Sequence, residues 1–160
     1  MSAMAAKPST EKKVELLFKI QGIHISNFSL DNSLSRQSLA PDHSYAFEIN
    51  AGTLIDASLK IIGVDFITRI FTSQTKDDKV CELSLRISYA IQNFESFTTI
   101  EKDKVTIPEQ LMHHLIALTI STTRGILFEK LQGSFLSKII LPTINVSSLN
   151  KMNSDKPLIQ

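Results

Sequence analysis

The sequence predicts an α+β protein, with a four-stranded antiparallel sheet packed on one long helix and a short helix near the C-terminal end. Two patterns lead to this prediction. Between Val14 and Gln92, apolar and polar residues alternate along several segments, which is typical of strands with one buried face. From Thr106 to about Gly133, apolar residues instead recur at helical spacing.

The first expected strand begins at Val14 and is long and irregular. Its apolar residues form three alternating groups: Leu16, Phe18 and Ile20, then Ile23 and Ile25, then Phe28 and Leu30. Because side chains alternate strictly between the two faces of a strand, each change of phase predicts a bulge or a bend, and Gly22 marks the first. Residues 31–44 are rich in turn-forming types and predict a loop, which nevertheless carries Leu34 and Leu39.

Three more strands are expected before the helix. Tyr45, Phe47 and Ile49 alternate in a short second strand, which residues 51–53 end. A third strand runs from about Leu59 to Thr72. The fourth has the most regular alternation, and its apolar face comprises Cys81, Leu83, Leu85, Ile87, Tyr89 and Ile91. A period of two sustained over this length predicts one buried face and one wet face.

The long helix has recognisable ends. Thr106 and Glu109 fit a capping box, Pro108 falls in the first turn, and Gly133 is a suitable stop. The apolar stripe of the helix is broader than one four-stranded sheet can cover, which predicts a partner subunit and therefore a homo-oligomer. After the helix, Asn145 can cap a short final helix that ends at Leu149.

Length and composition fit one folded domain, expected over residues 14–149, between a disordered segment 1–13 and a flexible tail 150–160. The 17 basic and 16 acidic residues leave a net charge of +1 without a basic cluster, so we expect no nucleic-acid partner. The single cysteine, Cys81, favours a reducing compartment, the cytoplasm. The start lacks the apolar core of a signal peptide, and no apolar run reaches the roughly 18 residues of a membrane span. We therefore expect neither export nor membrane insertion.

The standard catalytic and metal-binding sequence motifs do not occur in the chain. His113 and His114 are adjacent and point about 100° apart on a helix, which prevents them from sharing a metal ion. Cys81 falls on the apolar face of a strand, where a thiol is unreactive. These observations predict that the protein is not an enzyme and uses no cofactor or metal.

Short motifs along the chain match one known family. FKIQGIHI (Phe18–Ile25) lies near the start, and the pair Cys81-Glu82 falls on the fourth expected strand. Near the end, five features stand at or within one position of a characteristic spacing: Arg124, Gly133, Leu141-Pro142, Asn145 and Leu149. Together with the order of elements, these residues resemble the SecB family of protein-export chaperones from about Val14 to Leu149.

The resemblance implies an assembly and a function. Members of this family pair their sheets into dimers, and two dimers sandwich their long helices into a tetramer. They hold non-native secretory precursors in apolar grooves and pass them to the translocation ATPase SecA through an acidic sheet face and tail. For this chain the resemblance implies unfolded polypeptides as clients, a dimer of dimers, and SecA as a candidate partner that Asp31 and Glu82 would dock.

The chain departs from the family in its charge. It is near neutral, its end carries Lys151 and Lys156 where family members are acidic, and Asn27 stands where another acid is expected. These departures weaken SecA docking more than client holding. A SecB-like relative dedicated to one client, for instance the antitoxin of a toxin–antitoxin pair, fits equally well.

A surface that holds many clients must be apolar and adaptable, which flexible leucine-bearing loops satisfy. The candidate client-binding residues lie on strands, in the loop and after the long helix: Phe28, Leu30, Leu34, Leu39, Phe47, Leu141, Ile144 and Val146. The alternative for these residues is that they close the core. Two other functions stay open: an oligomeric adaptor without apolar grooves, and a small-ligand binder or enzyme with an enclosed pocket.

Overall fold

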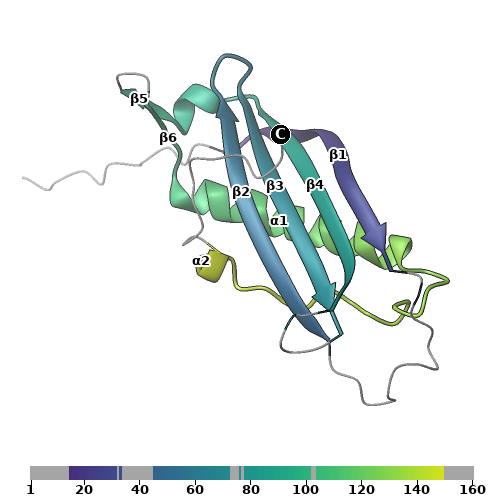
Figure 1. Cartoon of the computed structure of the whole chain (residues 1–160). Helices are drawn as coiled ribbons and strands as arrows, with labels where there is room; N and C mark the ends of the chain where they lie inside the picture. The colour runs from purple at the N-terminus through teal and green to yellow at the C-terminus, as the bar shows by residue number, and fades with distance from the viewer. Residues whose placement is uncertain are drawn as a thin grey trace, which may run out of the picture.

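The computed structural model describes residues 15–31, 33, 45–72, 76, 78–101 and 104–149. One antiparallel sheet has the strand order β1-β4-β3-β2, with β1 spanning Phe18–Leu30, β2 Ala46–Asp56, β3 Ile61–Phe71 and β4 Lys79–Ile91. The long helix α1 (Glu109–Lys130) runs behind this sheet in Figure 1, and the short helix α2 (Val146–Leu149) follows it. The expected fold class is thus confirmed. Segments 1–13 and 150–160, as well as Leu34 and Leu39, lie outside the described residues.

The two irregularities expected in the first strand are confirmed. The pairing of β1 with β4 shifts register between Ile20 and Gly22 and again between Ile25 and Asn27. Each bulge inserts one extra residue, which restores the phase of the apolar residues that follow it. As a result, every apolar group of β1 faces the same side as the apolar residues of β4, in the pairs Ile20 with Tyr89, Ile23 with Ile87, Ile25 with Leu85, Phe28 with Leu83 and Leu30 with Cys81.

The core lies between the sheet and α1. The apolar face predicted for the fourth strand is buried from Cys81 to Ile91, and β3 adds Ile62, Val64, Phe66 and Ile70 to it. The helix contributes Leu111, Leu115, Ile116, Ile120 and Leu127. The Tyr89 hydroxyl lies 3.2 Å from the Leu115 carbonyl oxygen and 2.9 Å from Thr119 Oγ1, which gives this buried polar group the partners it needs.

The second strand is longer than the sequence indicated. It continues through Ala51 and Gly52, which are buried, and pairs with β3 up to Asp56 without a shift in register. The prediction that residues 51–53 end the strand was therefore wrong. Pairing with a central strand supplies the backbone hydrogen bonds of these small residues, and it overrides their weak strand propensity.

The start of the helix also differs from the expectation. Thr106 belongs to a small hairpin, made of β5 (Thr99–Glu101) and β6 (Lys104–Thr106), that follows a 3-10 helix at Phe94–Ser96. The helix begins at Glu109 after Pro108, without a side-chain capping bond, so the predicted capping box is wrong. At the other end, Gly133 adopts a φ of 78° beyond the last helical residue, which fits its predicted role as a stop.

Candidate functional site

Three isoleucine side chains of β1 are only partly covered. Ile20 is 47% exposed, Ile23 45% and Ile25 39%, although all three point to the helix side of the sheet. The helix packs on the central strands β3 and β4, and β1 is an edge strand (Figure 1). We call Ile20, Ile23 and Ile25 the β1 patch. An apolar row of this kind on a sheet edge is a typical contact for another chain.

The exposed face of α1 borders this patch. The His114 ring meets the Phe18 ring edge-on at 5.6 Å, and the Lys130 ammonium lies 5.9 Å from the Phe28 ring centre. These contacts place the helix alongside β1 from one end to the other. By helical spacing, Ala117, Ser121 and Gly125 share the face of His114, and all of them are exposed. The middle of this face therefore carries only small side chains, between His114 and Phe128.

The apolar stripe of α1 is mostly covered within the subunit, contrary to the expectation that it would require a partner. Leu111 and Leu115 are buried, and Leu118 is partly buried against the core. Beside this stripe, the exposed apolar side chains include those of the β1 patch and Phe128, which is 47% exposed. The reasoning from the helix was wrong because the sheet and the chain after the helix together cover the stripe.

Three of the candidate client-binding residues gather at one end of the sheet. Leu30 and Phe47 occupy the same row across the four strands, which runs from Leu30 through Cys81 and Ile70 to Phe47. Phe28 lies two residues before Leu30 on the same face. All three are partly buried and pack against the core, so they combine a structural role with some accessible apolar surface.

The other described candidates lie in or just after the irregular segment 139–145, which we call the strap. Leu141 is 2% exposed and belongs to the core, whereas Ile144 and Val146 are partly buried against it. Ile140 is 60% exposed and was not among the candidates. Ile140 stands in the run Ile139-Ile140-Leu141, and the sequence alone does not tell which of three consecutive apolar residues turns outward.

One side chain of α1, that of Arg124, forms hydrogen bonds with the strap. Arg124 donates a hydrogen bond from Nε to the Leu141 carbonyl at 3.1 Å and another from Nη2 to the Pro142 carbonyl at 3.2 Å. Among the described residues, the backbone from Ile140 to Ile144 makes no hydrogen bond with other backbone groups. The Arg124 guanidinium therefore gives the carbonyl groups of Leu141 and Pro142 the hydrogen-bond partners that secondary structure would otherwise provide.

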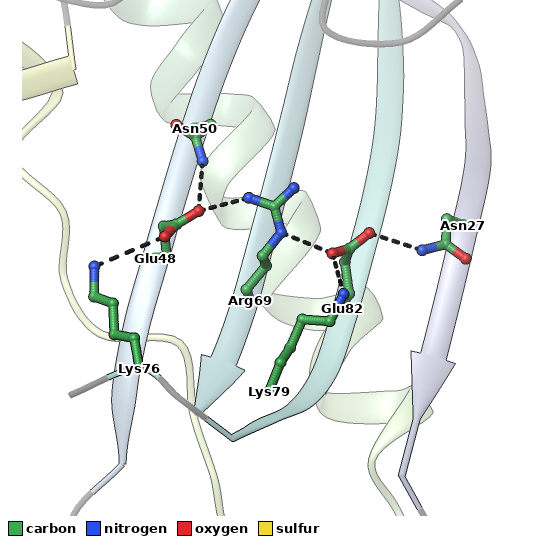
Figure 2. A network of polar contacts seen from close by, with 7 residues as sticks. All are labelled: Asn27, Glu48, Asn50, Arg69, Lys76, Lys79 and Glu82. Carbon is green, nitrogen blue, oxygen red and sulfur yellow. Dashed lines mark hydrogen bonds and ion pairs between the residues drawn. The ribbon is translucent and has the colours of Figure 1, made fainter. Parts of the chain in front are cut away.

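A polar network crosses the opposite face of the sheet, which α1 does not cover. Figure 2 shows its members on all four strands and in the turn between β3 and β4: Asn27, Glu48, Asn50, Arg69, Lys76, Lys79 and Glu82. Arg69 is the centre, with Nη1 2.5 Å from Glu48 Oε1 and Nε 2.7 Å from Glu82 Oε2. Lys79 and Asn27 each donate a further bond to Glu82 at 2.9 Å.

Asp31 and Glu82, the acids predicted to dock a partner, both lie near the end of β1 at Leu30, but their environments differ. Hydrogen bonds from Lys79, Arg69 and Asn27 lower the pKa of Glu82 to about 2, and its side chain is only 14% exposed. Asp31 is exposed, and its pKa is lowered by hydrogen bonds with Ser33. Glu82 is thus engaged inside the subunit, so it offers little free charge to a partner. Asn27, which the sequence marked only as a missing acid, is one of its donors.

A second ion pair lies nearby on the same face. Arg86 Nε is 2.5 Å from Asp65 Oδ1, and Arg86 Nη2 is 3.0 Å from Asp65 Oδ2. The Asp65 side chain is fully buried, whereas that of Arg86 is 25% exposed. The two-point geometry satisfies both carboxylate oxygens, as a buried acid requires.

Three observations on the described residues concern metal binding, thiol chemistry and membrane crossing. No group of three His, Cys, Asp or Glu residues there could hold a metal ion. Burial raises the pKa of the Cys81 thiol to about 11, so the thiol stays protonated and unreactive. Across the same residues, no helix combines the length and apolar character needed to cross a membrane.

Comparison with known proteins shows which fold the chain has. No protein-family model and no curated protein matches the sequence. Among solved structures, the SecB-like chaperone of Mycobacterium tuberculosis, in complex with a ChAD peptide from the HigA1 antitoxin, aligns with a TM-score of 0.53. The alignment covers 80% of this chain and 90% of that chain at 10% sequence identity. The chain has a SecB-like fold.

The SecB-like fold was the one that the sequence motifs implied. A protein of unknown function from Streptococcus agalactiae also aligns, at 10% identity and a TM-score of 0.41, over 82% of this chain and 99% of that chain. At 10% sequence identity, the similarity to the SecB-like chaperone is one of backbone fold. The side chains described above determine what this chain does with the fold.

Proposed function

We propose that this protein is a molecular chaperone that holds non-native polypeptides on the apolar surface of a homo-oligomer. The observation that carries the proposal is the amount of apolar surface that the SecB-like fold leaves open, at the β1 patch and at Ile140 of the strap. An enzyme would instead need convergent reactive groups; no group of three His, Cys, Asp or Glu residues that could hold a metal ion occurs among the described residues, and burial keeps the Cys81 thiol protonated.

A second copy of the chain is the proposed occupant of the β1 patch. Two edge strands related by a twofold axis can bury their isoleucines against each other in a self-complementary contact. The small residues Ala117, Ser121 and Gly125 support this assignment, because they leave the middle of this helix face without bulky side chains, which permits close approach of another subunit. An added Cβ at Gly125 would meet nothing within 4 Å, so the fold of one subunit does not require glycine there.

The clients are proposed to bind the remaining apolar surface. Ile140 is a large apolar side chain of the strap that is 60% exposed, and Ile144 and Val146 follow it four and six residues later, partly buried against the core. Phe28, Leu30 and Phe47 add a partly buried apolar end of the sheet. Leu141 supports the strap from inside the core rather than contacting a client.

The polar network bears on which kind of chaperone this is. SecA docking in the SecB family uses acidic residues, whereas Glu82 here is neutralised by Arg69 and Lys79, and Asn27 supplies an amide in place of an acid. This arrangement favours a cytoplasmic chaperone dedicated to one client, such as an antitoxin. Hand-off of secretory precursors to SecA is the alternative function.

The proposal is tested by mixing the purified protein with a chemically denatured aggregation-prone protein and following light scattering. We expect the wild-type chain to suppress aggregation at a near-stoichiometric ratio. Ile140→Ser should weaken client affinity about fivefold, the effect of removing one exposed apolar contact. Ile100→Ser is the matched control, because Ile100 is 59% exposed but lies on the β5–β6 hairpin. Failure of the wild-type protein to delay aggregation would reject the function.

A further inference from the structure

We infer that Arg124 is the positioning residue of the client-binding strap, and that it acts by holding the backbone at Leu141 and Pro142 so that Ile140 faces outward. The inference deepens the proposed function and rests on it. Arg124 itself is not a contact residue. Its two hydrogen bonds end on consecutive carbonyl groups of the strap.

The strap needs such an anchor because it lacks the usual backbone support. Ile139 still donates a hydrogen bond to the Leu136 carbonyl at 2.8 Å, and the next described backbone bond joins Ser148 to the Asn145 carbonyl at 3.0 Å. Between these two points, only side chains fix the strap among the described residues. Segments with few backbone bonds open at low cost in free energy, so single contacts can decide whether they stay in place.

Arg124 and the apolar core both hold Leu141 of the strap. Leu141 is 2% exposed, so its side chain is held in the core while its carbonyl is held by Arg124 Nε. The residue before it, Ile140, is 60% exposed. Fixing one residue at both its side chain and its carbonyl leaves the preceding side chain little freedom to turn inward. A strap released from Arg124 would have to be ordered again when a client binds, which costs affinity.

Arginine fits this role better than lysine. Its planar group carries donors in a fixed fork and can reach two neighbouring carbonyl oxygens at once, whereas a lysine ammonium acts as a point charge on a flexible stem. Arg124 is also partly exposed, so it can hold the strap without the cost of burying a charge. Arg124→Lys should therefore restore only part of the function lost in Arg124→Gln.

Strap opening is measured first, without any client. In the variant Leu141→Cys, the rate of thiol labelling reports how often the strap leaves the core, and Cys81 adds little background because it is 1% exposed. Adding Arg124→Gln should accelerate this labelling at least about tenfold, the minimum expected for losing two hydrogen bonds from a charged, partly exposed donor. Leu127→Cys is the control: it is equally buried in α1 but lies outside the strap.

A second measurement keeps Leu141 in place. Lys138 is exposed just before the strap, and Lys60 is exposed in the turn between β2 and β3. With a lysine-specific protease, Arg124→Gln should speed cleavage after Lys138 and leave cleavage after Lys60 unchanged. Equal acceleration at both sites, or at both engineered cysteines, would make Arg124 a general stability residue and overturn the inference.

Client binding completes the test. Arg124→Gln should weaken suppression of client aggregation about as much as Ile140→Ser does, with Arg124→Lys in between and the oligomer mass unchanged. A loosened strap with undiminished suppression would overturn the inference and leave the chaperone function standing. If the wild-type chain suppresses no aggregation, the proposed function fails, and the labelling result still shows whether Arg124 anchors the strap.

Discussion

At the scale of single residues, one arginine determines the character of the outer sheet face. Arg69 lies between Glu48 and Glu82 and forms an ion pair with each carboxylate. Its own positive charge is therefore compensated within the subunit. Exposed ion pairs of this type contribute little singly, but several charges linked in a network and partly shielded from water contribute more. The network therefore stabilises the sheet while it removes acidic groups from the surface.

The depressed pKa of Glu82 predicts a pH dependence of stability. Its ordinary value is 4.5 and its folded value about 2, so the carboxylate stabilises the folded state above about pH 4.5 and this contribution disappears as the pH falls towards 2. Glu82→Gln should lower the free energy of unfolding by about 2 kcal/mol near neutral pH, with the difference from wild type shrinking across that window. Urea denaturation at several pH values measures this difference.

Glu109→Gln provides the control for losing one negative charge, since the side chain of Glu109 is 76% exposed at the start of α1. Glu109 lies in the first turn of α1 and 3.4 Å from His113, so its effect on stability should stay within about 1 kcal/mol. A Glu82→Gln difference that stays constant from neutral to acid pH would mean that the hydrogen bonds to Glu82 do not form in solution.

At the scale of elements, the bulges of β1 decide which side its apolar residues face. Without the second bulge, the alternation of side chains would turn Phe28 and Leu30 to the outer face, away from the core they pack against. The bulge at Ser26 is additionally supported by a hydrogen bond from its hydroxyl to the Ser84 carbonyl at 3.1 Å. The bulged strand thus joins two segments whose sequence patterns are out of phase.

Deleting Ser26 tests this role. We expect a loss of about 3 kcal/mol in the free energy of unfolding, because two large apolar side chains leave the core side together. Gly22→Ala is the comparison at the other bulge: an added Cβ would meet nothing within 4 Å, so stability should change by less than about 1 kcal/mol. Equal effects of the two changes in urea denaturation would contradict the assignment.

At the scale of the whole molecule, the β1 patch predicts assembly. A charge at Ile23 should dissociate the proposed homo-oligomer to the 17.9 kDa subunit, because a buried unpaired charge is strongly unfavourable. The subunit itself should lose little stability, since Ile23 is already 45% exposed in it. Light scattering of Ile23→Lys at micromolar concentration measures the mass.

The control for assembly is Leu54→Lys. Leu54 is 41% exposed but lies on β2, at the other edge of the sheet, so this change should leave the mass unaltered. A wild-type protein that is already monomeric would reject the assignment of the β1 patch to a second copy, and would make that patch available to clients instead.

Much of the fold was predictable because it follows from local patterns. Alternation along the fourth strand determined its buried face from Cys81 to Ile91, and the phase changes of the first strand located both bulges. The helical spacing of its apolar residues predicted the long helix. Thr106 and Glu109 match the capping-box pattern, but Thr106 belongs to a hairpin that precedes the helix. Local signals fail at such boundaries because the pairing of Thr106 with Thr99 is a contact that periodicity does not encode.

The candidate site was less predictable, for the same reason. The sequence by itself determined which residues are apolar and on which strand face they lie, and it supplied Glu82 as an acid on the outer face. Only the tertiary structure decided that the β1 patch is only partly covered, that Leu141 turns inward while Ile140 turns outward, and that Arg69 neutralises Glu82. Exposure and charge pairing depend on which elements pack together, and contacts between residues distant in sequence set that packing.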